Sequence, residues 1–274
     1  MKSIELNESL STFLSTYKLF EEDEIQQVQL QHRLDLVKAF GVKKGMRILE
    51  IGCGQGDTTV ALADAVGKNG KIIGIDIASR NYGSPLSLGQ ATDLIKKSAL
   101  GERISFHFEM DFETFCANEV FDIAVFSHSS WYFKRPEDLL RYFKKLRKMA
   151  KRICFAEWDL DFSYITQRSH FCAASILALH ANFVNNDGNI QNLFHKIQIQ
   201  ELLEKANFRI EKQCTVNAMY LQDAKWEKSY ANSIRKDFHE VPPMIQTMVN
   251  SYYQLMNTSN DNEQSLNSFI ICAR

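Results

Sequence analysis

The sequence lacks a surplus of charge of either sign. Its 32 lysine and arginine residues balance 33 aspartate and glutamate residues, which leaves a formal net charge of −1. A protein that holds a nucleic acid along its phosphate backbone needs a field of positive charge. The charge balance therefore argues against a nucleic-acid partner.

Long apolar runs are also missing. No segment reaches the roughly 18 consecutive apolar residues of a membrane-spanning helix, and the first residues lack the apolar core and cleavage site of a secretory signal. None of the six cysteines forms a C-x-x-C pair, so we expect no metal site. Reduced thiols fit the cytoplasm. We therefore expect a cytoplasmic protein with no membrane span.

What the sequence does contain is an alternation of short apolar runs with helical patterns. Such alternation is typical of a parallel sheet with helices on both faces. We predict an α/β fold, a Rossmann-like doubly wound and mostly parallel seven-stranded sheet with helical lid insertions. The expected strands are residues 47–51, 71–76, 103–109, 120–126, 152–158, 207–217 and 268–273, and helices are expected at 57–66, 86–98 and 136–150.

The chain of 274 residues is expected to form a single domain, residues 1–274. Residues 1–40 read as N-terminal helices, and residues 41–160 as a cofactor-binding core. Helical insertions are expected at 161–206, with a turn at 185–189, and at 218–260, where two helices are separated by consecutive prolines. Insertions near the carboxyl ends of the strands are well placed to form a lid.

A glycine-rich loop follows the first expected strand. Gly52, Gly54 and Gly56 recur at a spacing of two, between a strand and a helix, so backbone N–H groups can approach a ligand closely. Asp76 ends the next strand, where a carboxylate can accept hydrogen bonds from ribose hydroxyls. The spacing is not the G-x-G-x-x-G of a dinucleotide loop, and no P-loop lysine is present. The pattern predicts a nucleoside-type cofactor without pyrophosphate, and argues against a dehydrogenase.

Four stretches occur in an order found in a known family. They are ILEIGCGQGD (48–57), IIGIDIAS (72–79), EMDFE (109–113) and FDIAVFSHSSWYF (121–133). This order resembles the motifs of class I S-adenosylmethionine-dependent methyltransferases. The wider pattern also resembles bacterial proteins described as cyclopropane-fatty-acyl-phospholipid-synthase-like methyltransferases. The resemblance implies S-adenosyl-L-methionine as the cofactor.

The resemblance also implies roles for individual residues. Glu50 would face the methionine part and the ribose of the cofactor, together with Gly52, Gly54 and Gly56. Asp76 would bind the ribose hydroxyls.

Four further residues complete the cofactor site that the resemblance implies. Ile77 would pack on the adenine, and Asp111 and Phe112 would meet the adenine amine and ring. Ser127 would lie near the amino acid end of the cofactor. Phe112 as a plain core residue is an alternative.

The loop that leaves the fourth strand supplies the candidate acceptor side. His128 is the candidate catalytic base, since an unperturbed histidine titrates near neutral pH. A histidine that only shapes the loop is the alternative. Glu157 and Asp159 are further polar candidates. For Gln31 and His32, on the N-terminal helix, a solvated helix face is expected.

Aromatic residues surround this loop in the sequence. Trp131, Tyr132 and Trp158 could build a substrate-binding wall for a planar or cationic acceptor. Large aromatics at a strand end also occur as core residues, and that alternative stays open.

The functional hypothesis is S-adenosylmethionine-dependent methylation of a small molecule, at oxygen, nitrogen or carbon. The Asn/Asp-Pro-Pro-Tyr and Pro-Cys motifs of DNA methyltransferases are absent from the fourth-strand loop. The alternatives are methylene transfer to a lipid, as in cyclopropane synthases, and a non-catalytic regulator that binds S-adenosylmethionine. A homodimer is left open.

Overall fold

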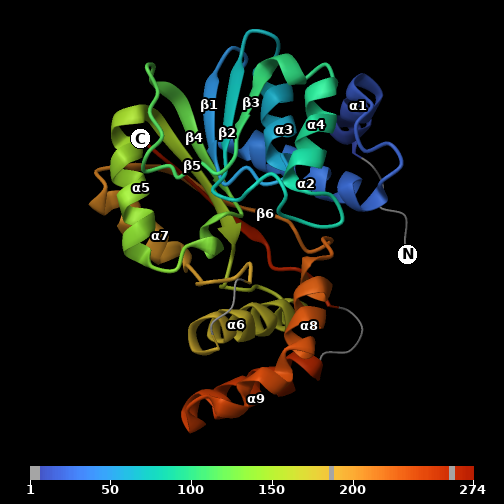
Figure 1. Cartoon of the computed structure of the whole chain (residues 1–274), viewed down its shortest axis with the longest axis vertical. Helices are drawn as coiled ribbons and strands as arrows, with labels where there is room; N and C mark the ends of the chain where they lie inside the picture. Colours follow the sequence, from blue (N-terminus) through green and yellow to red (C-terminus); the bar gives the residue numbers. More distant parts are fainter. Residues whose placement is uncertain (1–6, 185–187, 259–262) are drawn as a thin grey trace.

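A computed structural model describes residues 7–184, 188–258 and 263–274 (Figure 1). A mixed sheet of seven strands runs through these residues. The strands are β1 (Arg47–Ile51), β2 (Lys71–Ile75), β3 (Ile104–His107), β4 (Phe121–Ser127), β5 (Ala150–Trp158), β6 (Ile210–Val216) and β7 (Ser268–Ala273).

The strand order across the sheet is β3-β2-β1-β4-β5-β7-β6. All pairs from β3 to β5 are parallel, whereas β7 runs antiparallel to both β5 and β6. The predicted Rossmann-like, mostly parallel sheet is confirmed. Because β1 and β4 are neighbours, the loops that follow them meet at one edge of the sheet.

The helices cover both faces of this sheet and extend beyond one end of it. They are α1 (Glu8–Tyr17), α2 (Glu24–Phe40), α3 (Asp57–Val66), α4 (Leu88–Lys97), α5 (Pro136–Met149), α6 (Arg168–Phe183), α7 (Lys196–Lys205), α8 (Asp223–Ser233) and α9 (Pro243–Asn257). The described part of the N-terminal region, residues 7–40, contains the two helices α1 and α2. Within the helical insertion expected at 161–206, residues 188–195 are not helical. The expected turn at 185–189 includes residues 185–187, which lie outside the described residues.

Local sequence signals explain where several helices begin and end. The side chain of Asp23 accepts a hydrogen bond from the backbone of Gln26 and caps α2, and Gly41 ends that helix in a left-handed conformation. Ser87 and Gln90 form a reciprocal capping box at the start of α4. Pro136 occupies the first turn of α5, where no backbone donor is needed.

Two buried clusters lie on the two faces of the sheet. One cluster joins the sheet to α1, α2, α3 and α4. The other joins it to α5 and α7, which Figure 1 shows on the opposite side, and continues into α6 and α9. Burial on both faces explains why most strands read as uninterrupted apolar runs.

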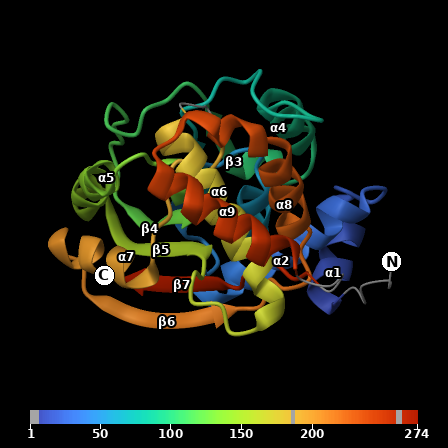
Figure 2. The same cartoon turned by 90° about the horizontal axis from the view of Figure 1, so that it is seen from below.

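Helices α6, α8 and α9 form a cap beyond the carboxyl ends of the strands. The chain enters α6 from β5 and α8 from β6, and α6 packs against both other helices. Figure 1 shows this group below the sheet, and Figure 2, seen from below, shows α9 crossing in front of α6. Within the described ranges, none of the helices has both the length and the apolarity needed to cross a membrane.

Candidate active site

A cavity of about 900 Å³ opens at the carboxyl ends of β1, β2 and β4. Its walls come from the glycine loop after β1, the loop after β2, the loop after β4 and the segment before α7. Such a position, where ligands bind in open α/β sheets, follows from the topology. The volume lies near the upper end of the usual 300–1,000 Å³ for ligand pockets.

The glycine loop forms one wall of this cavity. Gly52 and Gly54 line it with φ angles of +74° and +52°, which favour glycine. A Cβ atom at Gly52 would lie 2.6 Å from the Cβ of Ser129, so the loops after β1 and β4 touch here. Gly56 has a φ of +95° and packs against Ile95 rather than lining the cavity.

Asp76 and Ile77 form the adjoining wall. The carboxylate of Asp76 accepts hydrogen bonds from the backbone N–H of Gly54 at 2.8 Å and from that of Ala78 at 2.9 Å. It therefore joins the glycine loop to the loop after β2. Ile77 lines the cavity and is 68% exposed, which leaves an apolar face for a planar ring.

The loop after β3 contributes Phe112 but not Asp111 to the cavity lining. Phe112 is buried and packs edge-on against Tyr142 at 5.1 Å between ring centroids. Oδ1 of Asp111 accepts hydrogen bonds from the Tyr142 hydroxyl and the Glu113 backbone, both at 2.8 Å. In this arrangement Asp111 positions Tyr142, which itself lines the cavity.

Glu50 and Ser127 lie at the base of the cavity. Thr59 donates a hydrogen bond of 2.5 Å to Glu50, and burial raises the pKa of Glu50 to about 8. Thr58 donates to the Ser127 hydroxyl at 3.0 Å. Both donors belong to the first turn of α3, so the helix that follows the glycine loop also orients these two side chains.

Arg33, on α2, also lines the cavity. Its Nε and one terminal nitrogen, Nη1, are buried and have no hydrogen-bond partner among the described residues. A buried guanidinium donor without an acceptor is costly, because its hydration is lost without replacement. The sequence pattern did not single out Arg33, since nothing in the periodicity of α2 indicates that the helix packs beside the glycine loop.

The donor set of the cavity fits S-adenosylmethionine, a molecule with a carboxylate, an ammonium group and a sulfonium. The unpaired guanidinium of Arg33 suits the carboxylate. The charged lining residues comprise three carboxylates and two cations, namely Glu50, Asp57, Asp76, Arg33 and Lys134.

His128 lines the cavity from the loop after β4, with an unusual φ of +51°. Its Nδ1 lies 3.2 Å from Oε1 of Glu157, and its Nε2 lies 3.1 Å from Oγ of Ser268 and 3.3 Å from Nε2 of His32. Both ring nitrogens thus have partners. Burial, followed by the charge of Arg33, lowers the pKa of His128 well below its ordinary value. The imidazole is therefore neutral at neutral pH.

Glu157 and His32 contact the two ring nitrogens of His128. Burial raises the pKa of Glu157 to about 7. Its carboxylate accepts hydrogen bonds from the backbone and hydroxyl of Ser130 and from the Trp158 backbone. The expectation of a solvated face for Gln31 and His32 is wrong: both are buried, because α2 packs against the sheet there.

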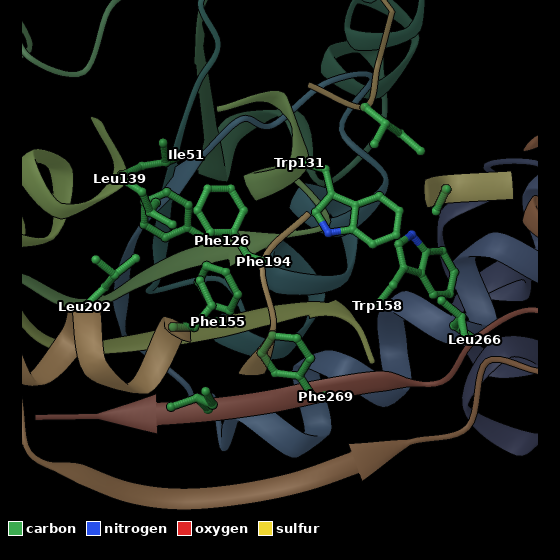
Figure 3. Close-up of a cluster of buried hydrophobic side chains, with 14 of the residues drawn as sticks. Ile51, Phe126, Trp131, Leu139, Phe155, Trp158, Phe194, Leu202, Leu266 and Phe269 are labelled. Atoms are coloured by element: carbon green, nitrogen blue, oxygen red, sulfur yellow. The ribbon is translucent and has the colours of Figure 1, made fainter. Parts of the chain in front are cut away.

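The three aromatic candidates for a substrate-binding wall do not all line the cavity. Tyr132 lines the cavity, whereas Trp131 and Trp158 are buried and absent from its lining. Figure 3 shows both indole rings within the apolar cluster, and the ring of Trp158 lies 4.4 Å from that of His128. The core alternative therefore describes the two tryptophans. Asp159 is also buried and forms an ion pair with Lys196 at 3.4 Å.

The segment before α7 closes over the cavity. The Tyr82 hydroxyl, from the loop after β2, donates a hydrogen bond of 2.9 Å to Oδ1 of Asn189. The carbonyl of Trp131 accepts from the backbone N–H of Gln191 at 2.8 Å. These two contacts tie the segment to both sides of the opening. Among the ranges described, no three His, Cys, Asp or Glu side chains gather as a metal site would require.

Comparisons with known proteins agree with this geometry. The family described as "Methyltransferase domain" matches residues 42–209, more than half of the chain. A crystal structure of a cyclopropane-fatty-acyl-phospholipid synthase-like protein from Lactobacillus casei ATCC 334 is similar over 96% of this chain and 98% of that one, with a TM-score of 0.86 and 31% identity.

Two curated relatives are similar over shorter stretches. Methyltransferase phomM of Diaporthe leptostromiformis is 30% identical over 175 residues, which are 54% of this chain and 45% of that protein. Demethylmenaquinone methyltransferase of Staphylococcus aureus (strain MRSA252) is 48% identical over 46 residues, 17% of this chain and 19% of that protein. The chain matches about half the length of the first of these relatives, and less of the second.

Proposed function

The chain belongs to the methyltransferase domain family, whose cofactor is S-adenosylmethionine, and from this premise we propose that it methylates a small molecule. The observation that carries the proposal is the single cavity that joins the glycine loop and Asp76 to His128 and Tyr132. At about 900 Å³ it has room for a second molecule beside the cofactor.

The cofactor end of the cavity is proposed to bind S-adenosylmethionine through groups that match its parts. Asp76 would accept hydrogen bonds from the ribose hydroxyls, and Ile77 and Phe112 would enclose the adenine. Arg33 would pair with the carboxylate, and Glu50 would face the ammonium group. When bound, the cofactor supplies an electrophilic methyl group on a sulfonium.

The acceptor end is proposed to lie between Tyr132 and His128. The acceptor would supply the electron pair of the new bond to the methyl carbon, and the electron pair of the broken carbon–sulfur bond would return to sulfur. If the attacking atom carries a proton, Nε2 of His128 could accept that proton. Nε2 would first have to leave its contacts with Ser268 and His32 and form a hydrogen bond to the acceptor. Glu157, at Nδ1, would hold the ring in the tautomer that leaves Nε2 basic.

Methylene transfer to a lipid would need a long apolar channel. Besides Tyr132 and His128, the cavity lining includes Lys134 and Asn189, and these polar groups favour a small polar acceptor instead. We therefore keep the small-molecule proposal.

The test is to incubate the protein with S-adenosylmethionine carrying an isotopically labelled methyl group and with separated metabolite, lipid and macromolecule fractions of a cell extract. The proposal predicts label in the metabolite fraction with the wild type, and a loss of labelling with Asp76→Asn. Asp93→Asn is a matched control, because that carboxylate is exposed, lies outside the cavity lining and pairs with Arg80 at 2.8 Å. Label confined to the lipid or macromolecule fraction, or no transfer, would contradict the proposal.

A further inference from the structure

A second cavity, of about 610 Å³, lies within the cap beside the first. Leu177 and His180 of α6, the segment Gly188–Ile190 and helix α8 line this cavity. Gly188 and Asn189 line both cavities, so the two spaces adjoin at that segment. The proposed function does not use this space.

Helix α8 presents an unusual stripe to the second cavity. Asp223, Trp226, Glu227 and Tyr230 all line it, at the spacing that places residues on one face of a helix. Trp226 and Tyr230 are 47% and 46% exposed, whereas the small residues Ala224 and Ala231 make the buried contacts of α8. The aromatic rings therefore face open space rather than the core.

The two carboxylates of the stripe have no lysine or arginine partner within the described part of the chain. Oδ2 of Asp223 accepts from the Gln29 side chain at 3.0 Å. Oε2 of Glu227 lies 2.8 Å from Nε2 of His170. Nδ1 of His170 accepts from the Leu266 backbone at 2.8 Å, so Nε2 is the ring nitrogen that faces Glu227. No described residue bonds to Oε1 of Glu227.

We propose that this second cavity binds a cationic nitrogen of the methyl acceptor, with Glu227 and Asp223 as its counter-charges and the rings of Trp226 and Tyr230 against its faces. Aromatic faces attract a cation through their negative π-systems, and nearby carboxylates add to that attraction. The inference rests on the proposed function and names its substrate class: a small amine or quaternary ammonium compound.

The position of the second cavity agrees with that role. Asn189 lines both cavities, and Tyr132 and His128 line the first one, so the second cavity adjoins the space proposed for the acceptor. A molecule held at its cationic end by α8 could thus extend past Asn189 towards Tyr132 and His128. The cap would then select the acceptor, and the sheet would hold the cofactor.

The experiment titrates choline into the protein saturated with S-adenosylhomocysteine and follows the indole N–H signals by NMR, with Trp226→Phe to assign the signal of Trp226. The inference predicts a saturable shift of that signal. The uncharged isostere of choline, in which a carbon atom replaces the ammonium nitrogen, should bind about tenfold more weakly or worse. Glu227→Gln and Asp223→Asn should each weaken choline binding by about tenfold.

Glu201→Gln is the matched control, because Glu201 lies on α7 and is exposed there. It should leave choline binding unchanged. Three results would each overturn the inference. Choline could fail to shift the Trp226 signal, it could bind no better than its isostere, or it could bind Glu227→Gln as well as the wild type. Binding of S-adenosylhomocysteine, measured on the same samples, separates the two failures: its loss would overturn the proposed function, and with it the inference.

Discussion

At the scale of single residues, the site depends on side chains whose roles the sequence indicated unequally. Asp76 and Ile77 follow a strand and line the cavity, as motif order led us to expect. Arg33 and His32 gave no such signal, because their importance comes from the packing of α2 against the sheet. Trp131 and Trp158 show the reverse: a suggestive sequence position, but burial in the core.

Arg33 provides the first prediction. Replacing Arg33 with methionine should weaken binding of S-adenosylhomocysteine by about 10- to 100-fold, since a buried hydrogen-bonded charge contributes about 1.5–3 kcal/mol. Binding of methylthioadenosine, which lacks the amino acid part, should stay as in the wild type. Calorimetry with both ligands measures the difference.

Lys38→Met is the control for this prediction, because Lys38 is an exposed cation on the same helix. It should leave both affinities unchanged. An equal loss of affinity for the two ligands in Arg33→Met would mean that the guanidinium supports the fold of the cavity and does not meet the carboxylate.

At the scale of elements, the glycine loop was predictable in detail, whereas the cap was expected only as helical insertions at 161–206 and 218–260, without the packing of its helices. The loop follows from three glycines between an apolar strand and a helix, a local pattern. The cap depends on how α6, α8 and α9 pack on one another. Their sequences show helical periodicity, but that pattern does not indicate which helix each of them packs against. The stripe on α8 could have been read from its spacing, but only the structure gives it a cavity to face.

Gly52 provides the prediction at this scale. Gly52→Ala should lower the free energy of unfolding by about 2–4 kcal/mol, because it combines a strained positive φ with a clash against Ser129. Gly41→Ala shares the positive φ but meets nothing within 4 Å, so it should lose only about 1 kcal/mol. Denaturant unfolding measures both. Equal losses would show that Ser129 yields to the added methyl group.

At the scale of the whole molecule, two buried carboxylates link stability to pH. Burial raises the pKa of Glu50 to about 8 and that of Glu157 to about 7. The folded protein therefore holds these protons more tightly than the unfolded chain does. Their contribution to stability is fully present below the unfolded pKa, near 4.5, and is lost as the pH rises through about 7 to 8.

Between about pH 5 and pH 8 these two carboxylates should make the free energy of unfolding of the cofactor-free protein fall, whereas the buried imidazoles of His32 and His128, whose pKa values burial lowers, contribute with the opposite sign. Glu157→Gln should reduce the fall by about 3 kcal/mol, the value of a shift from 4.5 to about 7. Glu201→Gln, a change at an exposed carboxylate, should keep the wild-type slope. Urea titrations across this range measure the slope, and parallel curves for Glu157→Gln and the wild type would contradict the account.

The central claim is that the cavity between the glycine loop and His128 holds S-adenosylmethionine, with Asp76 on its ribose. Calorimetric titration of S-adenosylmethionine into the wild type and Asp76→Asn tests it most directly. We predict saturable binding to the wild type and binding weaker by about tenfold or more to Asp76→Asn, because the substitution removes the negative charge and turns one of the two acceptor oxygens into an NH2 donor. No binding to the wild type, or equal binding to both proteins, would contradict the account.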